Sequence, residues 1–256
     1  MGKKTDDKTT ALALAEAFPI LVKEPAEIKA IMDANLAGGQ MTAFDFDRVT
    51  IPPAGGRMWN VPTLDGGEAS ETEVIGIIGH WQDVRAYWPG EFAGGEPPSC
   101  SSEDARLGVG DPGGNCQACG LAAFGSDKDA RGQACKQMRR LYIIRPGQLL
   151  PLVLTLPPSS LRAVRQFFVR LTSAQMPYWA VIAGVGLEAA ANKQGIKYSK
   201  ATFRVVRVLT DDEATRITAY VGSLREAFGS LEVSTADYGL PEDGPDEGDG
   251  PSGFDT

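Results

Sequence analysis

The four cysteines of this chain lie close together, between residues 100 and 135, and none occurs elsewhere. Their spacing is C-x15-C-x2-C-x15-C, and Cys116 and Cys119 form the pair in the middle. Glycine and proline are frequent around them, and these residues favour turns and contribute little to a hydrophobic core. The segment therefore needs another source of stability, and the thiols of Cys100, Cys116, Cys119 and Cys135 are the candidates.

A Zn²⁺ ion bound by four thiolates is the interpretation that this spacing favours most. A C-x2-C turn places two sulfur atoms near one ion, and four thiolates complete a closed, structural site. The outer cysteines are single, so the agreement with a standard zinc ribbon is incomplete. Four thiolates also suit an iron–sulfur cluster. A redox Cys-x-x-Cys pair usually begins a helix, whereas here a glycine follows Cys119 directly.

Disulfide bonds and free thiols are the remaining alternatives. Disulfides would require an oxidising compartment, but the N-terminal residues show neither the apolar segment nor the cleavage site of a secretory signal. No apolar run approaches the roughly 18 residues of a membrane span. We therefore expect a soluble, cytoplasmic protein without membrane contact, in which the four cysteines bind structural zinc.

Charge is distributed unevenly along the chain. The formal net charge is −8, and residues 231–256 contain eight acidic and no basic residues, so residues 1–230 sum to zero. Within that neutral body, residues 128–170 carry nine basic residues and one acidic residue, and residues 193–207 carry five basic residues and no acid. A basic middle predicts a polyanionic partner, and an acidic end predicts protein partners or serves solubility.

Hydrophobic periodicity predicts an α+β domain that is mainly sheet. The expected helices cover residues 11–36, 160–174 and 211–228, and the expected strands cover residues 44–51, 59–61, 73–88, 141–145, 152–156, 179–187 and 202–209. Gly76 and Gly79 allow bends or bulges in the long strand. The pattern favours a small closed β-barrel of the OB type, and a generic α+β domain is the alternative.

The domain limits follow from composition. We expect a polar and helical extension over residues 1–40, an OB-like domain over residues 41–230, and a disordered acidic tail over residues 231–256. The zinc-binding insert occupies about residues 96–137 of the domain.

Aromatic and basic side chains suggest a groove for single-stranded nucleic acid. Trp81, Arg85 and Tyr87 occupy alternate positions of the long strand and would project from one face. Single-strand binding combines cations that follow the phosphates with aromatic rings on which bases stack. Taken singly, each tryptophan fits the core better than a contact, and the basic residues could form a solvated surface. The combination with the OB-like pattern and the zinc module favours contact. The predicted contacts are Trp59, Trp81, Arg85, Tyr87, Lys136, Arg139, Arg140, Tyr142, Lys197, Tyr198 and Lys200.

Enzymatic chemistry has little support in the sequence. No phosphate-binding loop, dinucleotide fingerprint or Gly-x-Ser-x-Gly elbow is present. The single histidine, His80, has no evident nucleophile beside it and is expected in the core or at the surface. A metal-dependent nuclease would need a cluster of carboxylates that the pattern does not provide. We therefore expect a protein without enzymatic activity.

Several short motifs resemble the single-stranded DNA-binding proteins of tailed phages and mobile elements. They are residues 97–102 (PPSCSS), 116–119 (CQAC), 124–126 (FGS), 132–136 (GQACK), 156–161 (LPPSSL) and 198–203 (YSKATF), together with the acidic end. The resemblance covers about residues 40–256. It implies an OB fold, a zinc-binding insert and a C-terminal tail for protein contacts. Some such proteins include a histidine among the zinc ligands, whereas all four here are cysteines. The resemblance therefore assigns no role to His80.

The leading hypothesis is a single-stranded DNA-binding protein for phage-type replication or recombination in the cytoplasm of a bacterial host. It would coat exposed strands and contact replication or recombination proteins through its tail. The predicted partner-binding residues of the tail are Asp243, Asp246, Glu247, Asp249, Phe254 and Asp255. The alternative is a zinc-ribbon interaction protein that docks on a host polymerase or another replication or transcription enzyme.

Overall fold

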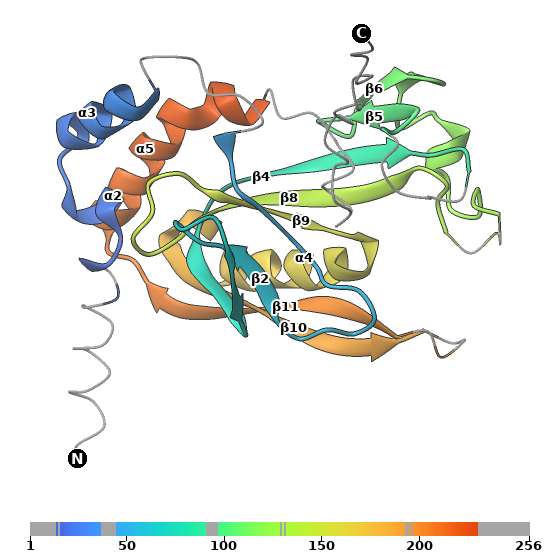
Figure 1. The fold of residues 1–256 in the computed structure, drawn as a ribbon. Coiled ribbons are helices and arrows are strands. Elements are labelled where there is room, and N and C mark those ends of the chain that lie inside the picture. Colours follow the sequence, from blue (N-terminus) through green and yellow to red (C-terminus); the bar gives the residue numbers. More distant parts are fainter. Residues whose placement is uncertain are drawn as a thin grey trace, which may run out of the picture.

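The computed structural model describes residues 14, 16–36, 45–90, 97–128, 130, 132–192, 195 and 197–229, with side chains described as far as residue 224. The helices are α2 (Pro19–Val22), α3 (Pro25–Leu36), α4 (Pro158–Ser173) and α5 (Asp211–Gly229), with 3-10 turns η2 (Gly120–Ala122) and η3 (Tyr178–Ala180). The strands are β1 (Arg48–Thr50), β2 (Trp59–Pro62), β3 (Glu68–Glu71), β4 (Glu73–Tyr87), β5 (Cys100–Ser102), β6 (Leu107–Gly110), β7 (Gly114–Asn115), β8 (Lys136–Ile144), β9 (Leu152–Leu156), β10 (Val181–Ala191) and β11 (Lys197–Val208). The chain is mixed α+β and rich in sheet, as predicted (Figure 1).

The long strand β4 organises the main sheet. It pairs with β8 along one edge. Along the other edge its first residues pair with β10 and its last residues pair with β5. The register against β8 shifts between Ile78 and His80, where the strand bends at Gly79. The long, bent strand that the sequence predicted is therefore present.

The sheet does not close into a barrel. From β4 the order continues through β8 and β9 on one side and through β10 and β11 on the other. A closed barrel would require β9 to pair with β11, but β11 pairs only with β10 among the described strands. The reason is that β1 occupies the free edge of β9, where it pairs in parallel. The closed barrel expected from the sequence is therefore wrong for the described residues.

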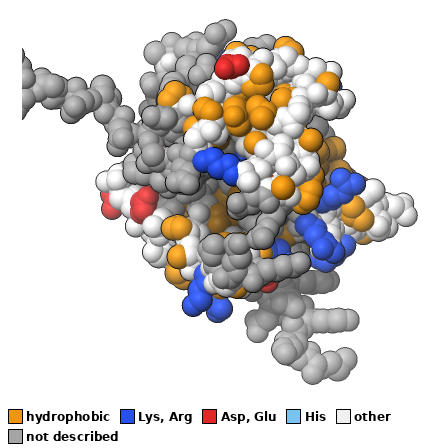
Figure 2. All heavy atoms as spheres, turned by 90° about the vertical axis from the view of Figure 1, so that its right-hand side faces the viewer, with side chains coloured by type: hydrophobic (Ala, Val, Ile, Leu, Met, Phe, Trp, Pro, Cys, Tyr) orange, Lys and Arg blue, Asp and Glu red, His pale blue; other side chains and the backbone are white. Residues whose placement is uncertain are grey.

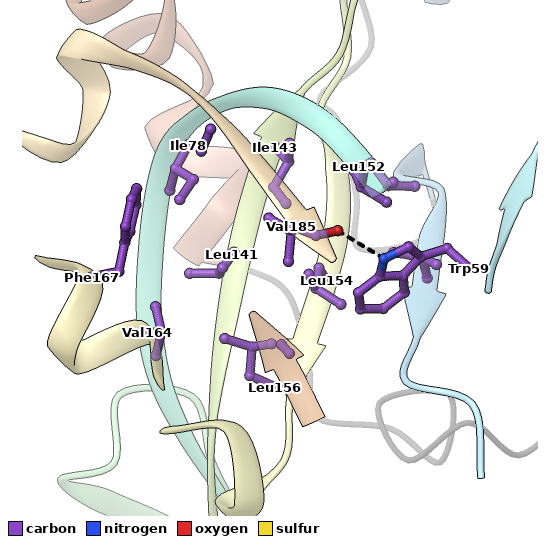
Figure 3. Close-up of a cluster of buried hydrophobic side chains, with 14 of the residues drawn as sticks. Trp59, Ile78, Leu141, Ile143, Leu152, Leu154, Leu156, Val164, Phe167 and Val185 are labelled. Atoms are coloured by element: carbon purple, nitrogen blue, oxygen red, sulfur yellow. Dashed lines mark hydrogen bonds between the residues drawn. The ribbon is translucent and has the colours of Figure 1, made fainter. Parts of the chain in front are cut away.

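The curved sheet buries side chains on both of its faces, because alternate residues of a strand point to opposite sides. The inner face packs against α4, which lies between β8–β9 and β10–β11 (Figure 1). The inner core includes Trp59, Ile78, Leu141, Ile143, Leu154, Leu156, Val164, Phe167 and Val185 (Figure 3). The outer face packs against α2, α3 and α5 through Ile77, Tyr142, Ile144, Val153 and Ile182.

Helix α4 begins two residues earlier than the sequence predicted. Pro157 is the N-cap residue and Pro158 the first helical residue, a position that tolerates proline because its missing N–H has no partner there. Ser160, in the first turn of the helix, is completely buried. Its Oγ accepts a hydrogen bond from the backbone N–H of Ala201 at 3.0 Å, which ties α4 to β11.

No helix in the described part of the chain is long and apolar enough to cross a membrane. The helical segment expected over residues 11–36 is divided into α2, which begins at Pro19, and α3, which begins at Pro25. These helices lie beside α5 at the end of the molecule away from β5 and β6 (Figure 1).

Candidate metal centre and nucleic-acid groove

The sheet places the two outer cysteines on either side of one strand end. Cys100 begins β5 and lies opposite Tyr87 of β4. Cys135 directly precedes β8, whose first residue, Lys136, lies opposite Ala86 of β4. Because β5 and β8 pair with different edges of β4, the two cysteines flank its end.

The middle pair is brought to the same place by a short antiparallel meander of β5, β6 and β7. Cys116 follows β7, and its N–H donates to the carbonyl oxygen of Arg106 at 2.8 Å. Gly108 of β6 lies opposite Gly114 of β7, and a Cβ at residue 108 would lie 3.0 Å from the sulfur of Cys100. A glycine here therefore leaves room for the thiol.

All four cysteines line one small cavity of about 10 Å³. None of them forms a disulfide bond. Among the described residues, no group of three or more His, Cys, Asp or Glu side chains is arranged as metal ligands. The four thiols thus share one cavity without being drawn together into a coordination shell.

Arg85 is the charged neighbour of this cavity. Its Nη1 donates to the backbone carbonyl of Cys135 at 3.5 Å, and its Nη2 donates to Oε1 of Gln137 at 3.0 Å. Burial raises the pKa of the Cys135 thiol, and the positive charge of Arg85 opposes part of that rise. A set of four thiolates would carry excess negative charge, which a guanidinium at this position would stabilise.

A groove of about 590 Å³ opens next to the cysteines, between β4 and the segment that follows β5. Trp81, Asp83 and Arg85 line it from alternate positions of β4. Arg106 and Gln117 line it from the cysteine-containing segment. The groove therefore combines one large aromatic ring with two guanidinium groups and the carboxylates of Asp83, Glu103 and Asp104.

Asp104 also lines the groove, but its carboxylate holds the local backbone. Oδ1 accepts hydrogen bonds from the N–H groups of Arg106 at 2.8 Å and Leu107 at 3.0 Å, and from the hydroxyl of Ser102 at 3.0 Å. The Leu107 hydrogen bond is the largest influence on the pKa of Asp104, which lies below its ordinary value although burial opposes the shift. The carboxylate thus fixes the turn that presents Arg106.

Several basic side chains of the predicted positive surface are paired with acids that lie far away in the sequence or on a neighbouring element. The ion pairs are Arg139 with Asp83, Arg145 with Glu71, Lys200 with Glu188, Arg204 with Glu73, and Arg207 with Glu213. Figure 2 shows Lys and Arg side chains at separate places on the side of the molecule that carries the ends of β4 and β8, rather than in one patch. Part of the basic charge counted in the composition is therefore compensated by these ion pairs.

Three predicted contact residues are completely buried. Trp59 lies in the inner core, where its Nε1 donates to the carbonyl oxygen of Val185 at 2.8 Å (Figure 3). Tyr142 and Arg140 share the outer face of β8, and both are 0% exposed. These side chains offer no surface to a ligand, so the prediction that they contact nucleic acid is wrong for this structure. The reason is that β8 is covered on both faces.

The remaining predicted contacts occupy three places. Trp81 and Arg85 line the groove, and Arg139 lies behind Trp81. Tyr87 lines the cysteine cavity, and the half-buried Lys136 follows Cys135. Lys197, Tyr198 and Lys200 belong to β11, which begins before the strand expected over residues 202–209, and none of them lines the groove.

His80 is half-buried, and its ring lies 5.4 Å from the ring of Tyr142. Its position is thus intermediate between the two that the sequence left open, the core and the surface. The predicted partner-binding residues Asp243, Asp246, Glu247, Asp249, Phe254 and Asp255 lie outside the described residues.

Sequence reasoning missed Asp83, Arg106 and Gln117 as groove residues. Asp83 could have been found, because it shares the alternation of Trp81 and Arg85. Arg106 and Gln117 reach the groove only through the fold of the cysteine-containing segment, whose strand pairing has no periodic signal. No family model matches the chain, and no curated protein and no solved structure matches it.

Proposed function

We propose that this chain is a non-enzymatic single-stranded DNA-binding protein that acts in replication or recombination of the phage type. The observation that carries the proposal is the groove in which Trp81 lies with Arg85 and Arg106. An indole provides a stacking surface for a base, and two guanidinium groups provide donors and charge for phosphates. The groove has the size of an ordinary ligand site.

The order of the strands supports the same proposal. If the short strands β5–β7 are set aside, β4 is followed along the chain by β8, β9, β10 and β11. Strand β4 pairs with both β8 and β10, and α4 separates β9 from β10 in the sequence. OB folds are five-stranded, partly open Greek-key barrels that bind oligonucleotides on the face of strands 2 and 3 and through the loops after strands 1 and 4. In that comparison the cysteine-containing segment is the first of these loops, and the hairpin between β10 and β11 is the second.

A structural Zn²⁺ bound by Cys100, Cys116, Cys119 and Cys135 is part of the proposal. The shared cavity of the four thiols and the nearby guanidinium of Arg85 fit such an ion. Four thiolates leave no open coordination position, so the ion would brace one wall of the groove rather than take part in a reaction. The acidic residues at 231–256 would contact replication or recombination proteins.

Substitution of the groove residues tests the proposal. Trp81→Ala should weaken binding to a labelled oligo-dT by roughly tenfold, as expected for the loss of one stacked base. Arg85→Gln should weaken binding at low salt and reduce the salt dependence. Lys29→Gln on α3, at the other end of the molecule, is the control and should bind like the wild type. Equal affinities for all four proteins by fluorescence anisotropy would contradict the proposed site.

One observation favours the alternative of a protein that docks on a replication or transcription enzyme. Leu107, Val109 and Phe124, all in the cysteine-containing segment, are 62%, 72% and 80% exposed. If these side chains form one contiguous apolar patch, that patch would be typical of a protein-binding surface. The triple substitution of these residues by serine should leave oligo-dT binding unchanged if the groove binds DNA, and should abolish partner capture if docking is the function.

A further inference from the structure

Arg139 is held in a fixed orientation by Asp83. The two residues lie directly opposite each other on β8 and β4. Nε of Arg139 donates to Oδ1 of Asp83 at 2.7 Å, and Nη2 donates to Oδ2 at 2.9 Å. The side chains are only 14% and 25% exposed. A bidentate pair of this kind fixes the plane of the guanidinium and compensates its charge.

The same guanidinium covers one face of Trp81. Cζ of Arg139 lies 4.1 Å from the centroid of the indole, within the range of a cation–π contact. Phe168 of α4 lies 5.8 Å from the indole and 5.9 Å from Cζ. If Phe168 and Arg139 lay on opposite faces of the indole, the Phe168 ring would be separated from Cζ by nearly the sum of the Cζ–indole and indole–Phe168 distances. Phe168 therefore contacts the edge of the stack, and it leaves the second indole face uncovered by either side chain.

The groove lies against Trp81 but not against Arg139. Trp81 and Asp83 line the groove, whereas Arg139 does not. Trp81 thus contacts both the groove and the guanidinium of Arg139, and Arg139 itself does not line the groove. A base that enters the groove would meet the indole, and the guanidinium would remain behind it.

We infer that Asp83 and Arg139 are positioning residues that hold Trp81 as the base-stacking platform of the groove, and that Arg139 does not bind phosphate. This inference rests on the proposed function and specifies how its site works. Its physical basis is that an indole held from behind loses little freedom when a base stacks on it. It also changes the role expected of Arg139, which the sequence alone grouped with the phosphate-binding cations.

The test compares three substitutions in oligo-dT titrations over a range of salt concentrations. Arg139→Gln should weaken binding about fivefold to tenfold and leave the slope of log K against log salt unchanged. Arg139→Lys should be almost as weak, because lysine keeps the charge but has no planar, bidentate group to stack on the indole. Arg85→Gln should instead lower the magnitude of the slope by about 0.7, the value for one phosphate contact on a single strand.

A second readout separates positioning from general damage. In a Trp81→Ala background, Arg139→Lys should cause no further loss of affinity, because both changes act through the same stack. Arg139→Lys should also change the tryptophan emission spectrum of the free protein, and the change should vanish in the Trp81→Ala background. Arg139→Lys retains the ion pair with Asp83, so it tests the inference even if Arg139→Gln does not fold.

Failure of this inference can be distinguished from failure of the proposed function. Wild-type affinity for Arg139→Lys, together with a reduced salt slope for Arg139→Gln, would show that Arg139 binds phosphate and would overturn this inference alone. Independent losses from the Arg139 and Trp81 substitutions would overturn it as well. A wild-type protein that does not bind oligo-dT at any salt concentration would overturn the proposed function and this inference together.

Discussion

The four thiols are the residues on which the account of the cysteine-containing segment depends. Cys135 is buried in surroundings that raise the pKa of its thiol, so an isolated thiol there would stay protonated. Metal binding requires the thiolate and supplies the free energy that offsets this cost. The segment has strands of only two to four residues, which alone give little stability.

Removal of one thiol therefore has a defined result. Cys119→Ser should lower the zinc content from one ion per chain to well below one, and should make the cysteine-containing segment sensitive to proteolysis. The measurement is elemental analysis of the purified protein, with limited proteolysis beside it. Thr72→Ser, away from the cysteines, is the control. Iron in place of zinc, with the visible absorption of a cluster, would replace the zinc assignment by an iron–sulfur site.

Gly76 shows how tightly β4 packs on β8 ahead of the bend at Gly79. A Cβ at this position would lie 2.4 Å from Cγ2 of Ile143 and 2.5 Å from the carbonyl oxygen of Ile144. Gly76→Ala should therefore lower the free energy of unfolding by about 1–3 kcal/mol. Gly222 in α5 has no atom within 4 Å of such a Cβ, and Gly222→Ala should raise the free energy of unfolding by about 0.5–1 kcal/mol. Urea unfolding of both variants checks the pair, and equal effects would contradict the packing described.

At the level of elements, the start of α5 forms a reciprocal cap. The N–H of Thr210 donates to Oε2 of Glu213 at 2.8 Å, and the N–H of Glu213 donates to Oγ1 of Thr210 at 3.3 Å. Arg207 of β11 donates to both carboxylate oxygens, at 2.9 and 3.0 Å. Burial acts to raise the pKa of Glu213, but these hydrogen bonds outweigh it, so the pKa lies below its ordinary value.

The depressed pKa determines how the cap responds to pH. Stability from ionised Glu213 is present above the ordinary pKa of 4.5 and is lost as the pH falls through the lower folded value. Glu213→Gln should reduce the free energy of unfolding by about 1 kcal/mol at pH 7. The difference in the free energy of unfolding between Glu213→Gln and the wild type should be smaller at acidic pH than at pH 7, as measured by urea unfolding under the two conditions. Asp212→Asn, an exposed neighbour, should change stability by only a few tenths of a kcal/mol at pH 7. A difference that grows in acid would contradict the cap.

Sequence pattern predicted most elements because their signals are local. The alternation in β4, the apolar face of α4 and the acidic start of α5 all follow from short-range periodicity. The pairing of Asp83 with Arg139 could not be predicted, because it depends on the register of β4 against β8. Nor could the pattern tell that Trp59 is a core residue, since burial of an indole depends on which strands curve around it. The cysteine spacing indicated a shared site, but the strand end that brings Cys100 and Cys135 together came only from the fold.

At the scale of the molecule, the centre of the sheet forms the hydrophobic cores and one end of β4 forms the groove. Its outer face is covered by α2, α3 and α5, and its inner face by α4, so neither face is free along the centre. The groove lies at the edge of the inner core, where Trp81 packs and β4 continues toward the cysteine-containing segment. Nucleic acid is therefore expected at one end of the molecule rather than across the sheet.

The acidic residues at 231–256 should weaken binding to this end. They bring eight negative charges to a chain whose remaining residues sum to zero, so they compete with phosphates for the same cations. Deletion of residues 231–256 should tighten oligo-dT binding at low salt, with a difference that fades as salt screens the charges. Replacement of the same segment by a neutral one of equal length controls for length. Unchanged binding at low salt would mean that the segment does not reach the groove.

The most direct measurement of the central claim is a comparison of strand preference in the intact protein. Fluorescence anisotropy at low salt would follow titrations of labelled oligo-dT and of a duplex of the same length. We expect salt-sensitive binding to oligo-dT at low micromolar or lower protein concentration and much weaker binding to the duplex, because only an unpaired base can stack on Trp81. Equal affinity for the two, or no binding to oligo-dT, would contradict the claim.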